Sequence, residues 1–261
     1  MSPVLPFDII TVIIDIAGEN KDTDLLKELA LVSHSFLQVC SKHLFASVDL
    51  QDVGWSYHES SKKRFVKLLK SRPDIVWYIR KLTYKVIYDM DDDDHLLSSI
   101  LLHLLPSFSR LNCLAISAST LDWNTLDTSL TSAILCLMHL PTINHIYLSD
   151  IQNFPLSSFT PCVNLHRLDL CGLECLDPVN EESPEIVVMP KIRELHTSGS
   201  CQLMTKLLHA KRQDGQPAFN FMDLRRLSMS YDNSENEPHI RYLLQNAKNS
   251  IYLLSPGLIR V

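Results

Sequence analysis

Apolar residues near the start of the chain recur at the spacing of a short helix. Pro6 is followed by Ile9, Ile10, Ile13 and Ile14. Residues three and four apart lie on one helix face, and proline suits the first helical turn because its missing N–H would be unpaired there. The same run has strand propensity, but its spacing and the glycine at position 18 favour a helix that ends at that glycine.

Two further short helices are predicted before residue 50. The first covers residues 23–31, and the second begins after Ser33, whose side chain can accept a backbone N–H of the first turn. The inward positions of the two helices are predicted to be Leu25, Leu26, Leu29, Phe36, Leu37, Val39, Cys40 and Leu44. A unit of about 45 residues seldom buries a sufficient core alone, so this unit needs a neighbouring domain or a partner.

This order of features resembles the F-box of fungal and other eukaryotic ubiquitin-ligase receptors. The resemblance starts at Leu5-Pro6, continues through residues 29–36 and ends at residues 44–50, with Phe36 where many relatives carry tryptophan. It implies that the helices insert into a Skp-type adaptor. The adaptor-binding residues implied are Leu5, Pro6, Ile9, Ile13, Leu29, Val32 and Phe36. The alternative is a helical cap that only covers the end of the next domain.

Past residue 70 a short phrase recurs, in which an apolar residue is followed by two variable residues, an apolar one, a variable one and an apolar one. Its central apolar residues are Leu82, Leu114, Ile146, Leu168, Leu195 and Leu227. They are separated by 32, 32, 22, 27 and 32 residues, which is near the period of leucine-rich repeats with irregular insertions. Segments with helical spacing lie between the phrases.

A repeated strand and helix buries its apolar face only when copies stack into one parallel sheet covered by helices. The phrases also resemble the degenerate leucine-rich repeats that follow the F-box in many fungal proteins. The predicted fold is therefore α/β, with a three-helix F-box at residues 1–50, a connecting helix at 51–74 and an irregular leucine-rich-repeat solenoid with a curved parallel sheet at 75–261. The six glycines show no nucleotide-binding spacing, which argues against a doubly wound fold.

Variable residues beside each central apolar residue are expected to form two columns on the concave face of this sheet. The first column is Lys81, Cys113, His145, Arg167, Glu194 and Arg226, and the second is Thr83, Ala115, Tyr147, Asp169, His196 and Ser228. The alternation predicts that Leu168 is buried and that Asp169 faces solvent.

Mixed polar and aromatic residues on such a face suit a protein or peptide partner. The predicted client-binding residues are His145, Tyr147, Arg167, Asp169, His196 and Arg226. Two alternatives remain open at this point. The face can be polar only for solubility, and the outer loops can provide recognition instead.

Composition argues against several classes of protein. A pI near 6.0, with 24 basic and 30 acidic residues, gives no general attraction for phosphate, so nucleic acid is not an expected partner. The basic cluster at residues 62–64 is expected to be a solvated helix end. Seven cysteines without a paired framework indicate reduced thiols and a cytoplasmic or nuclear location.

No membrane segment or secretory signal is predicted. The longest apolar stretch contains His103 and ends at Pro106, and no basic residue precedes Lys21. A membrane-spanning helix needs about 20 apolar residues, and a signal peptide needs a basic start. A membrane is therefore not an expected partner.

Candidate chemistry in the sequence lacks the required spacing. His166, Cys171 and Cys175 are close together but form no C-x-x-C pair. The acidic run at residues 91–94 lacks the alternation and glycine of a calcium loop, and residues 198–201 lack the flanking glycines of a nucleophile elbow. No catalytic residue, metal or cofactor is therefore predicted, and the chain is not expected to be an enzyme.

The leading hypothesis is a substrate-recognition subunit of a Skp-cullin-F-box ubiquitin ligase. The F-box would bind the Skp-type adaptor and, through it, cullin, while the repeats would hold an unidentified client protein and raise its concentration near the transfer site. One alternative is a protein-interaction scaffold without ubiquitin transfer. The other is an enzyme built on the repeat sheet.

Overall fold

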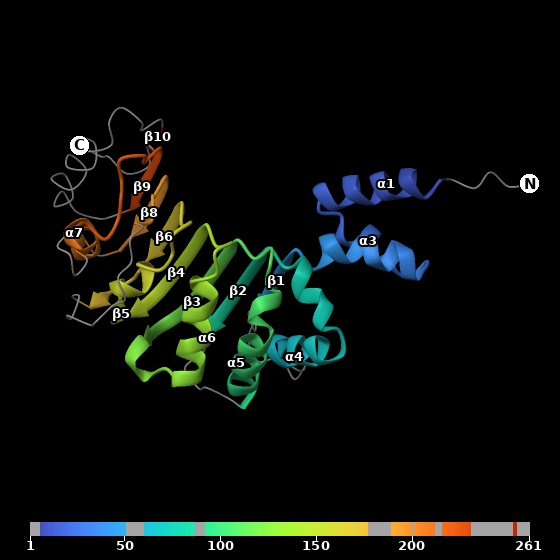
Figure 1. The fold of residues 1–261 in the computed structure, drawn as a ribbon, viewed down its shortest axis with the longest axis horizontal. Helices are drawn as coiled ribbons and strands as arrows, with labels where there is room; N and C mark the ends of the chain where they lie inside the picture. The colour runs from blue at the N-terminus through green and yellow to red at the C-terminus, as the bar shows by residue number, and fades with distance from the viewer. Residues whose placement is uncertain are drawn as a thin grey trace, which may run out of the picture.

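The structure of the chain is a computed structural model. It describes residues 6–50, 60–86, 92–176, 189–199, 201–211, 216–230 and 253–254. The described part is a mixed α/β arrangement with a small helical unit beside a long parallel sheet (Figure 1).

The N-terminal unit contains α1 (Phe7–Glu19), α2 (Thr23–Ala30) and α3 (His34–Leu44). The prediction of a helix for the isoleucine run is confirmed, as is the Ser33 cap, whose hydroxyl accepts the Phe36 N–H at 3.3 Å. The core of the unit consists of four buried side chains. These are Ile14, Ala17, Leu26 and Cys40. Leu25 was predicted to face inward, but it is 37 % exposed because α2 packs through Leu26 instead.

A polar contact and a close approach hold α1 against α3. The Asp15 carboxylate accepts hydrogen bonds from Lys42 and His43, both at 2.7 Å. Gly18 lies inside α1, which continues to Glu19, so its predicted role as the stop of this helix is wrong. A Cβ atom at Gly18 would lie 2.1 Å from His43 Nδ1, and the glycine is therefore needed for the approach of the two helices.

The chain enters the large sheet directly after α3. Strand β1 (Ser47–Leu50) pairs in parallel with β2 (Lys81–Val86), so the last four residues of the segment predicted as the F-box belong to the sheet. Between them lie α4 (Ser61–Ser71) and the 3-10 helix η1 (Pro73–Tyr78). The first part of the predicted connecting helix, residues 51–59, lies outside the described residues.

The other strands of the main sheet follow one another in chain order. They are β3 (Cys113–Asp122), β4 (His145–Gln152), β6 (Arg167–Cys171), β8 (Glu194–Ser198), β9 (Arg226–Ser230) and β10 (Leu253–Leu254). The sheet order is β1-β2-β3-β4-β6-β8-β9-β10, and each neighbouring pair is parallel. All six recurring phrases therefore form strands, and the sheet curves along its length (Figure 1).

A repeated hydrogen bond sets the register at the start of the strands. The Arg80 carbonyl accepts the N–H groups of Asn112 and Cys113 at 2.9 and 3.0 Å. The Asn112 carbonyl accepts those of Asn144 and His145, both at 3.0 Å. The same pairing of one carbonyl with two N–H groups recurs at each step from Ala46 to Arg226, so the central apolar residues align from strand to strand.

Helices and short turns connect the strands on one side of the sheet. The helices are α5 (Asp92–Leu104), α6 (Thr128–Met138) and α7 (Cys201–His209). The short elements are η2 (Leu105–Ser107), η3 (Trp123–Thr125), η4 (Leu156–Phe159) and the two-stranded pair β5 (Phe154–Pro155) and β7 (Cys175–Leu176). The shortest repeat step, 22 residues, has η4 as its connection, which explains the irregular spacing.

Aromatic rings fill the space beneath the strands where the connections are short. Trp123 and Phe154 have ring centres 4.7 Å apart, and Phe154 and Phe159 follow at 5.3 Å. Phe219 and Phe221 continue the series at 5.9 Å for each contact. Such pairs add to the burial of apolar area, so these rings take the place of helices as the cover of the sheet.

The helix α4 contributes an unexpected buried cation. Lys62 is only 2 % exposed, and its ammonium lies 5.0 Å from the centre of the Tyr84 ring on β2. The prediction that this basic cluster is a solvated helix end is therefore wrong for Lys62. A cation above an aromatic face is favourable when it is shielded from water.

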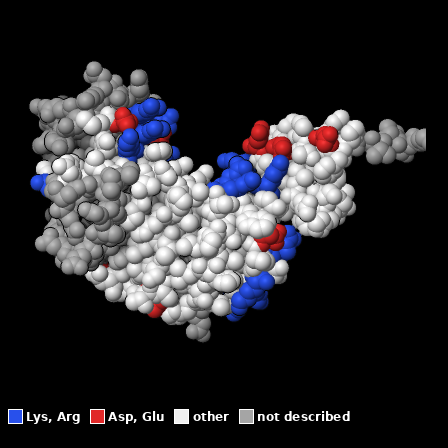
Figure 2. Space-filling view, in the orientation of Figure 1, with Lys and Arg blue, Asp and Glu red and all other residues white. Residues whose placement is uncertain are grey.

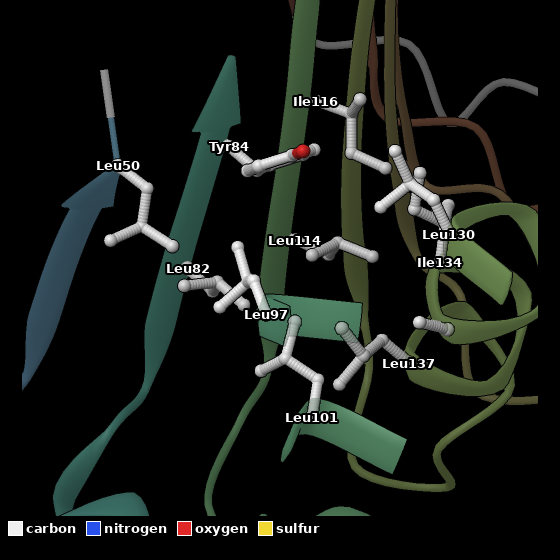
Figure 3. Close-up of a pocket in the computed structure, with 11 residues that line it drawn as sticks. Leu50, Leu82, Tyr84, Leu97, Leu101, Leu114, Ile116, Leu130, Ile134 and Leu137 are labelled. Carbon is white, nitrogen blue, oxygen red and sulfur yellow. The ribbon is translucent and has the colours of Figure 1, made fainter. Parts of the chain in front are cut away.

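A small cavity lies between β1, β2 and β3 on one side and α5 and α6 on the other (Figure 3). Leucines of both helices, such as Leu97 and Leu137, point toward Leu114 on the central strand. The cavity has a volume of about 10 Å³. Such a volume barely admits one water, and its lining is apolar, so it is a feature of core packing.

We predict that Leu168→Ala strongly destabilises the protein. Leu168 is fully buried in the sheet core, and truncation of a buried leucine costs about 2–5 kcal/mol of unfolding free energy. Lys81→Ala is the matched control because Lys81 is exposed on the same sheet and should change stability by less than about 0.5 kcal/mol. Urea unfolding followed by circular dichroism measures both, and similar losses would contradict the core assignment.

Candidate functional site

The side chains of the main sheet alternate between its helix-covered side and its open face. Leu82, Leu114 and Leu168 are buried beneath the sheet, so the residues beside them project from the other face. The strand register aligns Lys81, Cys113, His145, Arg167, Glu194 and Arg226 in one column, and Thr83, Ala115, Tyr147, Asp169, His196 and Ser228 in the next. Both predicted columns are thereby confirmed as neighbours across the sheet.

Asp169 is the centre of a polar network on this face. Its Oδ2 atom accepts a hydrogen bond from His145 Nε2 at 2.8 Å, and the Arg167 guanidinium donates from Nε at 3.1 Å. Asp169 is only 5 % exposed, so the prediction that it faces solvent is wrong. The reason is that the longer His145 and Arg167 side chains cover the short carboxylate from two strands.

The network continues toward the C-terminal end of the sheet. Arg167 Nη1 lies 3.6 Å from Glu194 Oε2, and Glu194 Oε1 lies 3.1 Å from Arg226 Nη1. Four of the predicted client-binding residues, His145, Arg167, Asp169 and Arg226, thus belong to one chain of contacts with Glu194. Tyr147 and His196 are half-buried in the column that contains Asp169.

Two members of the network were not among the predicted site residues. Glu194 links Arg167 to Arg226, and Cys113 Sγ lies 3.2 Å from His145 Nδ1. Both already stood in the first predicted column. No local sequence motif identifies these two residues. What identifies them is the strand register, which places Cys113 opposite His145 and Glu194 opposite Arg167.

The network shifts the pKa values of its central pair. Burial lowers the pKa of His145, but hydrogen bonds to Asp169 and Cys113 outweigh this effect and raise it to about 9. Burial raises the pKa of Asp169, but hydrogen bonds from His145 and Arg167 outweigh it and the pKa is lowered. At neutral pH the pair is therefore an imidazolium and a carboxylate.

Basic side chains gather near the two ends of the open face. Figure 2 shows Lys and Arg over the β8 and β9 end and others near the junction with the N-terminal helices. Arg193, Arg225 and Arg226 are exposed at the β8 and β9 end.

The second candidate surface is the outer side of the three-helix unit. Ile9, Ile13 and Val32 are 47, 45 and 64 % exposed, whereas Leu29 and Phe36 are partly buried against the small core. Pro6 is exposed just before α1, and Leu5 lies outside the described residues. The predicted adaptor residues are therefore divided between the outer surface and the core of the unit.

Other exposed apolar residues of this unit were missed from the sequence. They are Phe7, Val12, Ile16 and Leu31. With Ile9 and Ile13, the residues Val12 and Ile16 form an i, i+3, i+4, i+7 stripe on the outer side of α1. Ile14 and Ala17 on its other side are buried, so α1 is apolar on both faces and only one is covered.

The candidate metal ligands of the sequence do not come together in the described part of the structure. Among the residues that the structure describes, no group of three or more His, Cys, Asp or Glu side chains is placed to hold a metal ion. His166 instead has its Nδ1 atom 3.3 Å from the Lys191 carbonyl. The side chains of the acidic run at residues 91–94 lie outside the described part.

None of the described helices is both long enough and apolar enough to cross a bilayer. Comparison with protein-family models, with curated proteins and with solved structures finds no significant match to this chain. The functional argument therefore depends on the two surfaces described above.

We predict that His145 makes stability depend on pH. Its folded pKa of about 9 exceeds the usual value of 6.5, so the folded state binds more protons between these values. The stabilisation is fully present below about pH 6.5 and is lost as pH rises through about 9. Melting curves from pH 6 to 10 should show this loss in the wild type and a smaller one in His145→Gln. Parallel curves for both proteins would contradict the ion pair.

Proposed function

We propose that the protein is the substrate receptor of a Skp-cullin-F-box ubiquitin ligase. In this proposal the three-helix unit binds the Skp-type adaptor, and the open face of the sheet binds a client protein. The observation that supports it most is the uncovered apolar stripe of α1. In this proposal the partner proteins carry out ubiquitin transfer, and this chain holds the client protein near the transfer site.

Exposed apolar surface is concentrated in the three-helix unit. Of the twelve large apolar side chains that are exposed in the described part of the chain, eight lie between Phe7 and Val32. Full burial of one such side chain contributes roughly 1.5–3 kcal/mol. Large apolar patches on soluble proteins commonly mark interaction sites, so this surface favours a partner with an apolar groove.

Helix stripes of this kind are recognised by grooves. The exposed positions on α1 follow the i, i+3, i+4, i+7 pattern by which an amphipathic helix inserts into an apolar cleft. The four positions of this stripe carry no charge, and the neighbouring Asp15 carboxylate is bound to Lys42 and His43. A mainly apolar adaptor contact fits these features.

The two candidate surfaces lie apart in the molecule. In Figure 1 the N-terminal helices stand at the β1 end of the sheet, while β6, β8 and β9 lie toward the other end. One partner can therefore occupy α1 without covering the polar network around Asp169. A receptor needs this separation because it must hold an adaptor and a client at the same time.

We predict that Ile9→Ala combined with Ile13→Ala weakens binding of a purified Skp-type adaptor by about fivefold or more, because truncation of central apolar contacts commonly costs over about 1 kcal/mol in total. Isothermal titration calorimetry measures the affinity. Asp24→Ala with Lys27→Ala is the control, since this exposed ion pair lies on α2 and should not affect binding. Adaptor affinity that is equal in both double variants, or no binding by the wild type, would overturn the assignment.

We predict that Tyr147→Ala combined with Arg226→Ala removes client proteins and retains the adaptor. Aromatic and arginine side chains most often dominate binding energy, and Arg167 is left in place because it holds Asp169. Affinity purification with quantitative mass spectrometry compares this variant with Lys81→Ala at the far end of the same face. Unchanged clients would assign recognition to another surface, and adaptor without cullin in the wild type would favour the scaffold function.

A further inference from the structure

Cys113, His145 and Asp169 form a connected set on three neighbouring strands. Cys113 Sγ lies 3.2 Å from His145 Nδ1, and His145 Nε2 lies 2.8 Å from Asp169 Oδ2. Both ring nitrogens are therefore occupied, one by a thiol and one by a carboxylate. A thiol beside a cationic imidazole that a third group orients is an arrangement that activates cysteines for covalent chemistry.

The fold holds the three groups in place. Cys113 and His145 are register partners across β3 and β4, and Asp169 is fixed by Arg167 Nε and Nη2 at 3.1 and 3.0 Å. The arginine keeps the carboxylate ionised and aims it at the imidazole. Asp169 therefore acts as a positioning residue for His145, and His145 is directed at the sulfur.

Three other cysteines are buried in surroundings that disfavour the thiolate. Burial raises the pKa of the Cys162 and Cys175 thiols to about 12 and raises that of Cys40 as well. Cys162 Sγ donates instead to the carbonyls of Met138 and Ser158. A thiol becomes a good nucleophile beside a protonated imidazole, whereas apolar burial makes it inert. Cys113 is thereby distinguished from these three thiols.

The surroundings of Cys113 favour disulfide substrates over acyl substrates. Acyl transfer needs free N–H donors for the oxyanion, but the Cys113 N–H is bonded to the Arg80 carbonyl at 3.0 Å. Thiol–disulfide exchange has no oxyanion and needs only approach to the sulfur. Lys81 and Arg167 lie in the same column on either side of the pair, so an anionic disulfide is attracted.

We propose that Cys113 is a nucleophilic thiol site that exchanges with small, carboxylate-bearing disulfides. Cys113 Sγ attacks one sulfur of the disulfide, forming a new S–S bond as the old one breaks. The Cys113 thiol loses its proton to solvent, the His145 imidazolium stabilises the resulting thiolate, and the leaving sulfur departs as a thiolate that takes a proton from solvent. One disulfide is consumed and one thiol is released, so the exchange balances without another oxidant. The site requires neither the adaptor nor a client.

The test uses the full chain and oxidised glutathione at neutral pH, with site-resolved mass spectrometry of each cysteine over time. Cys136 and Cys171 are the internal controls because both are half-buried. We expect Cys113 to form the mixed disulfide about tenfold faster than either control. Cys113 is only 8 % exposed, so access alone would make it slower than the two controls. A Cys113 rate equal to or below that of the controls would therefore overturn the proposal.

Two variants separate activation from access. His145→Gln should slow Cys113 by about tenfold and leave Cys136 unchanged, and circular dichroism verifies its fold. Asp169→Asn should shift the pH profile of the Cys113 reaction toward lower pH, because the imidazolium loses its carboxylate. A Cys113 rate that is unchanged in folded His145→Gln would contradict the role of the imidazole.

A comparison of an anionic and a neutral disulfide tests the preference for anionic substrates. Lys81→Ala should slow exchange with oxidised glutathione more than exchange with the neutral bis(2-hydroxyethyl) disulfide, because only the first is attracted by the lysine. Equal slowing with both disulfides would reject the preference for anionic substrates.

Discussion

The in-register stacking of parallel strands is the constraint on which the rest of the structure depends. At each step one backbone carbonyl accepts two N–H groups from the next unit, and the central residues from Leu82 to Leu227 form a continuous buried row. A unit with its own strand and connection has no other way to cover its apolar side. Once this row is formed, the residues beside it must project from the open face in columns.

The open face is more structured than its polar composition indicates. Its central carboxylate is nearly inaccessible, and charges alternate from His145 through Asp169, Arg167 and Glu194 to Arg226. Each buried charge is compensated by a neighbour on the same or an adjacent strand, which is the condition under which buried ionic groups are tolerated. The same contacts hold His145 against Cys113, so the proposed client recognition and the proposed thiol exchange depend on one set of contacts.

The three-helix unit, unlike the sheet, leaves much of its apolar surface uncovered. Among the described residues, its core has four buried apolar side chains, Ile14, Ala17, Leu26 and Cys40, and the Asp15 contacts with Lys42 and His43 hold α1 to α3. Much of its apolar surface faces outward. A partner that binds a unit this small would add to its stability, and this is the physical reason for the proposal that the unit is a docking module.

The strands, their alternation and most helices could be predicted from the sequence because these patterns depend on neighbours within a few residues. The two columns also followed, since the recurring phrase marks the same position in every strand. The sequence placed Ile9, Ile13 and Ile14 on one face of α1, which is wrong in part, because packing covers Ile14 and leaves Ile9 and Ile13 exposed. Likewise, only the tertiary structure placed Gly18 beside His43 and Lys62 over Tyr84.

The candidate site, too, could be predicted from the sequence only in part. Sequence reasoning selected His145, Arg167 and Asp169 as surface residues, yet the burial of Asp169 and its bonds to the other two depend on side chains reaching across strands. Cys113 and Asp169 are connected through His145, although two connecting segments of unequal length separate their strands in the chain. The sequence by itself determined which residues share a face; the folded sheet decided which of them touch, because side-chain length and register act only after the strands are side by side.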